Sequence, residues 1–223
     1  MYGDNNPIAW GGSGTLETVN NTSLSDYEAF YKAHYSPSIA SAITVSNLGE
    51  GAVKKALVPL GQWSGGDVAA APDQPYPAID TGILYFINKD GAAQSEIRIG
   101  RRALPYDATG EYYRAGLMNY VLGGAFNSRI NLNLREDKGY TYNIYSELDG
   151  MLWDGYFFIG GDFKSDITNK AIKEIYSEFG RLREELIPAE ELDMVKNYLM
   201  GTLLMSLDGP FNAMDVQKSF LAD

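Results

Sequence analysis

The segment Leu122–Tyr142 combines side chains that could bind a polar ligand with the signals of a helix end. Gly139 can take the left-handed conformation that ends a helix. Arg135 should therefore lie in the last turn of a helix, and Tyr140 should open the strand that follows. A guanidinium fork and a phenolic hydroxyl near one point could bind a backbone carbonyl and steady a negative charge forming on it. The pattern thus indicates a possible binding site at Arg135 and Tyr140.

Both residues also have a structural interpretation. A cation in the last turn of a helix is favoured by the helix dipole, and Arg135 could pair with Glu136 or Asp137. Tyr140 and Tyr142 would share one face of the predicted strand and could form a tyrosine stripe over the core. The residues alone leave the binding role and the structural role open.

The sequence lacks the residues that other kinds of catalytic site require. The chain has no cysteine and one histidine, His34, which is followed by Tyr-Ser-Pro, so neither H-E-x-x-H nor H-x-x-E-H is present. A lone imidazole does not make a zinc site, and we expect His34 to be half-buried near a helix end. A site made of carboxylates alone stays open, although no EF-hand loop occurs. Neither a nucleophile elbow nor a phosphate-binding glycine loop is present. We therefore predict no catalytic residue and no metal ligand in this chain.

Composition narrows the possible partners. The net charge is −11, which argues against nonspecific nucleic-acid binding because such binding neutralises phosphates with Lys and Arg. No apolar run approaches the roughly 20 residues of a membrane-spanning helix. The first residues lack the features of a signal peptide. The absence of cysteine does not fix the compartment, and the tyrosine- and asparagine-rich composition gives only an expectation of the bacterial periplasm or cell envelope.

The first third of the chain resembles the end of one folding unit. We expect a helix over Ser25–Tyr35 capped by Ser25 or Asp26, a buried strand over Ile39–Val45 and a short helix over Gly49–Leu60. Residues 64–77 are rich in Gly, Ala and Pro, which is typical of a linker. The sequence thus predicts a tail of a preceding α+β domain over residues 1–63, a linker over 64–77 and a second domain over 78–223.

The second domain shows strands followed by helices. The expected strands are Gly82–Asn88 and Gln94–Leu104, joined by a turn at Lys89–Gly91, and a hairpin of Tyr140–Leu148 with Met151–Gly161 turned at Asp149–Gly150. The expected helices are Asp107–Leu122 capped by Asp107, Phe126–Lys138, Ile167–Leu186, and one that starts at Pro188 and breaks near Gly209–Pro210. This order predicts an α+β fold, an antiparallel sheet with helices packed on one face.

Several motifs spread along the chain occur together. They are Phe30–Pro37 followed by Ile43–Val45, Gly91–Ser95, Leu122–Arg129, Asn133–Glu136, Lys138–Tyr142, and Ala189–Leu192 with Lys196–Gly201. The combination resembles the insulinase, pitrilysin and mitochondrial-processing-peptidase family of zinc metallopeptidases, the inverzincins. The resemblance extends over nearly the whole chain.

The resemblance implies a clamshell of homologous α+β domains, of which this chain supplies a non-catalytic, C-terminal-type half. One domain of such a clamshell carries H-x-x-E-H and a distant glutamate, which bind zinc and activate water. A facing domain contributes an arginine and a tyrosine that hold the peptide, and by motif match these are Arg135 and Tyr140. Gln94 and Ser95, on an edge strand, would help to order the substrate by strand addition.

The missing H-x-x-E-H motif then implies that zinc is bound by a partner, either a preceding domain of the parent protein or another subunit. We expect the chain to be a fragment of a zinc endopeptidase that acts on unfolded peptides or small proteins, and to be inactive alone. The alternative is a peptide-binding or scaffold subunit without proteolytic activity. Retention of both Arg135 and Tyr140 favours the peptidase, because a scaffold does not need the pair.

Overall fold

The computed structural model describes residues 1–3, 6–69, 82–107, 109–152 and 154–222. The chain divides into two compact units, Met1 with Thr81–Leu203, and Tyr2–Asp80 with Leu204–Asp223. We call the first the sheet unit and the second the helical unit. The predicted linker at 64–77 falls mostly outside the described residues, and the predicted domain boundaries stay a prediction.

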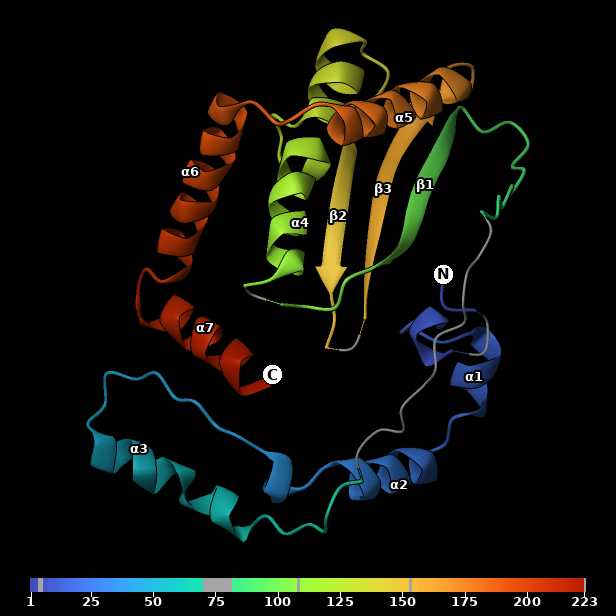
Figure 1. Cartoon of the computed structure of the whole chain (residues 1–223). Helices are drawn as coiled ribbons and strands as arrows, with labels where there is room; N and C mark the ends of the chain where they lie inside the picture. The colour runs from blue at the N-terminus through green and yellow to red at the C-terminus, as the bar shows by residue number, and fades with distance from the viewer. Residues whose placement is uncertain (4–5, 70–81, 108, 153, 223) are drawn as a thin grey trace. The chain divides into compact units, whose positions relative to one another are not determined.

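The sheet unit is built on three antiparallel strands. They are β1 (Gln94–Ala103), β2 (Ile144–Gly150) and β3 (Gly155–Lys164). Their order is β1-β3-β2, so β3 is central, and β1 forms an edge of the described sheet (Figure 1). Ile159 of β3 lies opposite Ile99 of β1 and Ser146 of β2. Because side chains alternate along a strand, this register places Ile97, Ile99, Ile144, Ile159 and Phe163 on one face.

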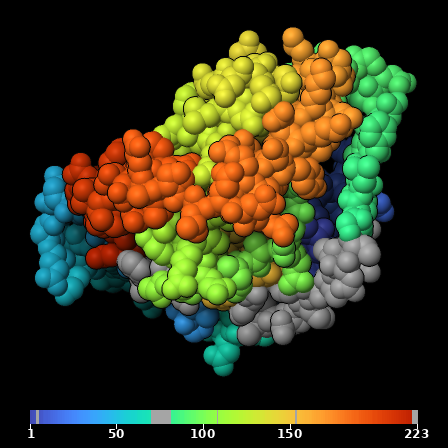
Figure 2. All heavy atoms as spheres, turned by 45° about the horizontal axis from the view of Figure 1, so that its top comes forward, coloured from blue at the N-terminus to red at the C-terminus, as the bar shows by residue number. Residues whose placement is uncertain are grey.

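Helices cover that face. They are α4 (Glu111–Asn119), which continues into the π-helical turn η4 (Tyr120–Gly124), then η5 (Asn131–Asp137) and α5 (Thr168–Glu184). The helix α6 (Ala189–Ser206) follows α5 in the chain. Figure 2 shows α5 in orange against the yellow-green helical segments that it contacts. The predicted fold class, an antiparallel sheet with helices on one face, is confirmed.

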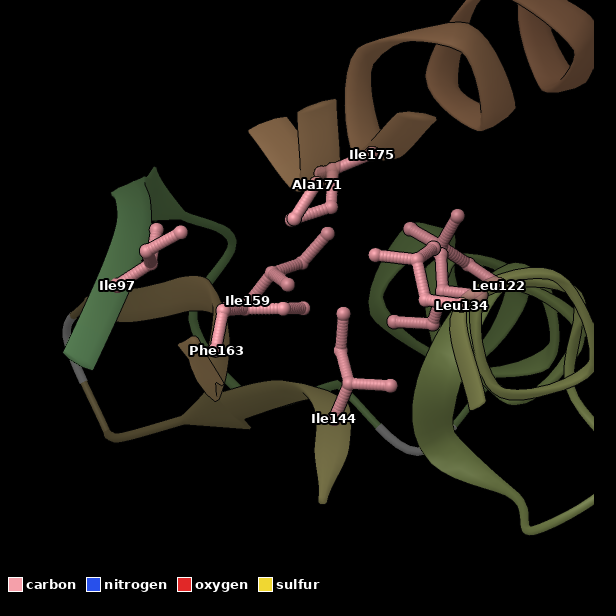
Figure 3. Packing of buried hydrophobic residues seen from close by; sticks show 9 residues of the cluster. Ile97, Leu122, Leu134, Ile144, Ile159, Phe163, Ala171 and Ile175 are labelled. Carbon is pink, nitrogen blue, oxygen red and sulfur yellow. The ribbon is translucent and has the colours of Figure 1, made fainter. Parts of the chain in front are cut away.

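The core lies between the sheet and these helices (Figure 3). Its fully buried members are Ile97, Leu122, Ile130, Leu134, Ile144, Ile159, Phe163, Ala171 and Ile175. The predicted helix near residues 167–186 is confirmed as α5, and it presents an apolar stripe to the core, since Ala171 and Ile175 are buried and Ile167, Phe179 and Leu182 pack against the same cluster. Burial of this kind contributes about 1.5–3 kcal/mol for each large side chain, so the core fixes how η5 and α5 lie on the sheet.

The helical unit contains short helices. They are η1 (Pro7–Ala9), α1 (Leu16–Asn21), α2 (Leu24–His34), η2 (Pro37–Ile39), α3 (Glu50–Leu57), η3 (Val58–Gln62) and α7 (Pro210–Ala222). Among its described residues, Tyr2 is the only buried hydrophobic side chain. The predicted helices near residues 25–35 and 49–60, and the break at Gly209–Pro210, are confirmed. The cap of α2 is Ser23 with Asp26 in a capping box, so the prediction of Ser25 or Asp26 as cap was wrong.

Two predicted strands are not formed. Residues 40–45 and 82–89 have no regular structure, and the side chains of Ile83–Ile87 are exposed. A strand gains its stability from pairing with a neighbour, and neither segment pairs with another strand among the described residues. An apolar composition favours a strand, but composition does not supply a partner strand.

Two boundaries also differ from the prediction. The hairpin of β2 and β3 forms, but Asp149 and Gly150 are paired within the strands, and Met151 N donates to Asp154 O across the loop. Gly110, not Asp107, caps α4, and the Asp107 carboxylate instead accepts a hydrogen bond from Thr109 N. Backbone hydrogen bonds from Thr109 and Gly110 lower the pKa of Asp107, the Thr109 bond being the larger cause.

Candidate functional site

Arg135 lies in the last turn of η5, as the sequence predicts. Gly139 has φ +61°, which confirms the left-handed helix end. The Nε atom of Arg135 is 3.5 Å from Oε1 of Glu136, a partly exposed pair that contributes little to stability. The guanidinium carbon also lies 4.3 Å from the ring centroid of Phe126. Arg135 is therefore held at the surface by an aromatic ring and a weak ion pair.

Tyr140 follows Arg135 closely but is placed differently from the prediction. Its backbone N–H donates to Leu134 O at 2.8 Å, so the chain turns back on the end of η5. The ring of Tyr140 packs against the hydrophobic core. Since β2 begins only at Ile144, the predicted tyrosine stripe on a strand is wrong. The backbone of Tyr140 thus lies at the helix end that carries Arg135, and its ring is half-buried.

Tyr142 is the second phenol of this segment, and it is 93% exposed. Its neighbour Thr141 is buried, and the Thr141 hydroxyl accepts from Asn143 N and donates to Asn143 O, both at 3.0 Å. This local bonding holds the backbone in a turn in place of a strand. The sequence pattern does not distinguish Tyr140 from Tyr142, whereas in the structure the ring of Tyr140 is half-buried and the ring of Tyr142 is exposed.

Asn131 fixes the loop in front of η5. Its side-chain nitrogen lies 2.9 Å from Ile144 O, 3.1 Å from Ser128 Oγ and 3.3 Å from Ala125 O. Asn131 is buried, so these bonds tie the turn before η5 to strand β2. Sequence reasoning missed this role. The available signal was a polar residue inside an apolar helical pattern, directly after Ile130.

Gly123 permits close packing next to this loop. A Cβ atom built there would lie 2.3 Å from Ile130 Cδ1 and 2.8 Å from Ser146 N. Only glycine allows η4 to approach β2 this closely. Gly123 therefore has a packing role.

Arg129 and Glu191 form a second polar centre, between the start of η5 and α6. Arg129 donates from Nε to Oε1 at 2.9 Å and from Nη2 to Oε2 at 2.7 Å, a bidentate pair. The hydrogen bond to Glu191 is the main cause that raises the pKa of Arg129. A neighbouring cavity of about 410 Å³ is lined by both residues and includes neither Arg135 nor Tyr140. Arg129 thus belongs to the packing of α6, and the candidate binding pair, Arg135 and Tyr140, is partly exposed and lies outside this cavity.

No zinc-type ligand set is found in the part of the chain that the structure describes, since no group of three or more His, Cys, Asp or Glu side chains could hold a metal ion there. His34 is exposed, with its ring 4.6 Å from that of Phe30, so the expectation of a half-buried histidine was wrong. Within the same described residues, no helix is both long and apolar enough to cross a bilayer.

The fold and the sequence together define the class of protein. An antiparallel sheet covered by helices on one face, with Arg135 in the last turn of a helix, defines an α+β domain. Residues 21–199 match the family described as the peptidase M16 inactive domain. The chain belongs to this family, which confirms the resemblance seen in the sequence.

Curated relatives agree with this family. An uncharacterized zinc protease of Streptomyces coelicolor is 25% identical over 218 residues, 93% of this chain and 46% of that protein. The uncharacterized zinc protease YmxG of Bacillus subtilis is 24% identical, over 87% of this chain and 46% of that protein. The chain thus spans about half the length of the relatives that it matches.

Solved structures show the same fold. A protease from Helicobacter pylori superposes with a TM-score of 0.80 at 19% identity, covering 93% of this chain and 51% of that one. The peptidase M16 inactive domain from Pseudomonas fluorescens gives a TM-score of 0.74 at 22% identity, covering 98% and 51%. At these identities the likeness establishes the fold alone.

Proposed function

We propose that this chain is the substrate-gripping, non-catalytic part of a zinc endopeptidase that acts on unfolded peptides or small proteins. Zinc, and the water that it activates, would belong to an H-x-x-E-H domain or subunit that works together with this chain. The observation that carries the proposal is the exposed end of η5, where Arg135 is held at the surface within a few residues of Tyr140 and Tyr142. Membership of the M16 inactive-domain family supports it.

The proposed peptide binding follows from the hydrogen-bond donors of the two side chains. A guanidinium presents several N–H groups in a fixed fork, and a phenol adds one O–H donor. Together they can bind the carbonyl oxygens of an extended peptide and hold it against a catalytic centre elsewhere. Positioning of this kind lowers a reaction barrier without any bond being made by the gripping residues. Tyr140 is the predicted phenol, and the exposed Tyr142 is a second candidate.

The test uses the complete enzyme, in which this chain is combined with its H-x-x-E-H half. We expect Arg135→Ala to lower peptide turnover while zinc content, measured by atomic absorption, stays unchanged. Tyr140→Phe and Tyr142→Phe, compared side by side, identify the phenol that contributes. Wild-type turnover in the Arg135 variant would end the assignment of this residue.

The alternative is a peptide-binding or scaffold protein without proteolysis. Such a protein would bind peptide, yet no combination with an H-x-x-E-H partner would yield cleavage. The cleavage assay therefore separates the two functions. A periplasmic or envelope location stays a prediction from composition.

A further inference from the structure

Phe126 is an exposed aromatic residue beside the proposed peptide-binding arginine, and we propose that it is a positioning residue that orients the Arg135 guanidinium. The inference rests on the proposed function of Arg135 and adds a residue to that site. Phe126 is 67% exposed, although it lies in the sheet unit close to a large core. Its ring nevertheless has a defined neighbour, the guanidinium carbon of Arg135 at 4.3 Å from the ring centroid.

The contact restricts a side chain that otherwise has great rotational freedom. Ordering an arginine on binding costs free energy, because rotamers are lost. A guanidinium attracted to an aromatic ring loses part of that freedom before the ligand arrives. Phenylalanine has no lone pair, so it accepts no conventional hydrogen bond from the guanidinium. Its ring therefore orients Arg135 while leaving donors available for a peptide carbonyl.

Phe126 can orient Arg135 only if its own backbone is fixed, and the structure provides two supports for it. Ser128 N donates to Ala125 O at 3.1 Å, which closes the turn around Phe126. The buried Asn131 side chain contacts Ala125 O and also Ile144 O of β2. The ring is thus mounted on a turn that is tied to the sheet. Asn131 ties the turn to the sheet, the turn carries Phe126, and the ring of Phe126 orients Arg135.

The test combines binding with a direct readout of side-chain order. Phe126→Leu keeps an apolar side chain and removes the ring, and Phe126→Tyr keeps the ring. We expect Phe126→Leu to weaken the binding of a fluorescein-labelled unstructured peptide about two- to fivefold, and Phe126→Tyr to retain it. In an Arg135→Ala background, Phe126→Leu should have no further effect. Nitrogen-15 relaxation of the Arg135 Nε–H group should report an ordered side chain in wild type and in Phe126→Tyr, and a mobile one in Phe126→Leu.

The outcomes separate this inference from the proposed function. An unchanged order of the Arg135 side chain in Phe126→Leu overturns the positioning role, whatever the binding result. Equal losses from Phe126→Leu with and without Arg135 would mean that Phe126 acts independently of Arg135, which also overturns it. Arg135→Ala with wild-type affinity would instead refute the proposed function. The exposure of Phe126 makes a folding defect in these variants unexpected, and thermal melting checks that point.

Discussion

At the scale of single residues, the chain contains two arginines with opposite surroundings. Arg129 is 9% exposed and bonded through Nε and Nη2 to one carboxylate, whereas Arg135 is partly exposed with a weak carboxylate contact and an aromatic neighbour. A buried cation held by a bidentate carboxylate serves packing, and a partly exposed cation with a weak ion pair can serve a ligand. This contrast is the physical reason for assigning binding to Arg135.

The pairing of Arg129 yields a prediction about stability. Glu191→Ala would leave a buried guanidinium without its counter-charge, so we expect the free energy of unfolding to fall by about 3 kcal/mol. The neighbouring Glu190→Ala is the matched control, because Glu190 is exposed in the same helical turn, and it should change stability by about 0.5 kcal/mol or less. Urea unfolding followed by circular dichroism measures both. Equal stabilities of the two variants would show that the buried pair does not stabilise the packing of α6.

At the scale of elements, sequence patterns predicted what depends on local residues. The stripe of α5, the edge strand β1 and the glycine end of η5 all follow from side-chain periodicity or backbone preference, and all are present. The strands expected at 39–45 and 82–88 depend on a partner strand, which no local pattern can supply. The prediction that Tyr140 opens the strand was wrong for a related reason. The hydrogen bonds between Thr141 and Asn143 hold a turn there, so β2 begins later in the chain.

One part of the candidate site could be predicted from the sequence and another could not. The location of Arg135 in a last helical turn is a local property, and the sequence predicted it. Its contact with Phe126 depends on how the turn before η5 folds back, and this fold is set by Asn131 reaching the backbone of β2. Contacts of that kind depend on how separate elements pack against one another, so local periodicity gives no pattern for them.

The helix end at Gly139 gives a prediction at this scale. Gly139 has φ +61°, so Gly139→Ala should cost about 1 kcal/mol, because a Cβ atom is disfavoured in the left-handed region. Gly180→Ala is the matched control, since Gly180 is inside α5 and a Cβ there would meet nothing within 4 Å. That change should stabilise the protein by about 0.5–1 kcal/mol. Melting temperatures that shift in the same direction for both variants would contradict the assigned helix end.

At the scale of the whole molecule, we propose that this chain binds the peptide and that another domain or subunit cleaves it. The family places the chain among inactive M16 domains, and the relatives that it matches are about twice as long. The central claim is therefore that this chain holds peptide through Arg135, whether or not a catalytic half is present. Binding can be measured without any cleavage.

The most direct test is the affinity of the chain for a fluorescein-labelled unstructured peptide, measured by fluorescence anisotropy. Arg135→Ala is compared with Arg114→Ala, a matched change at an exposed arginine of α4 outside the proposed site. Because a hydrogen bond from a charged donor contributes about 1.5–3 kcal/mol, Arg135→Ala should weaken binding about ten- to hundredfold. The Arg114 variant should bind like wild type. Equal affinities of wild type and Arg135→Ala would contradict the account.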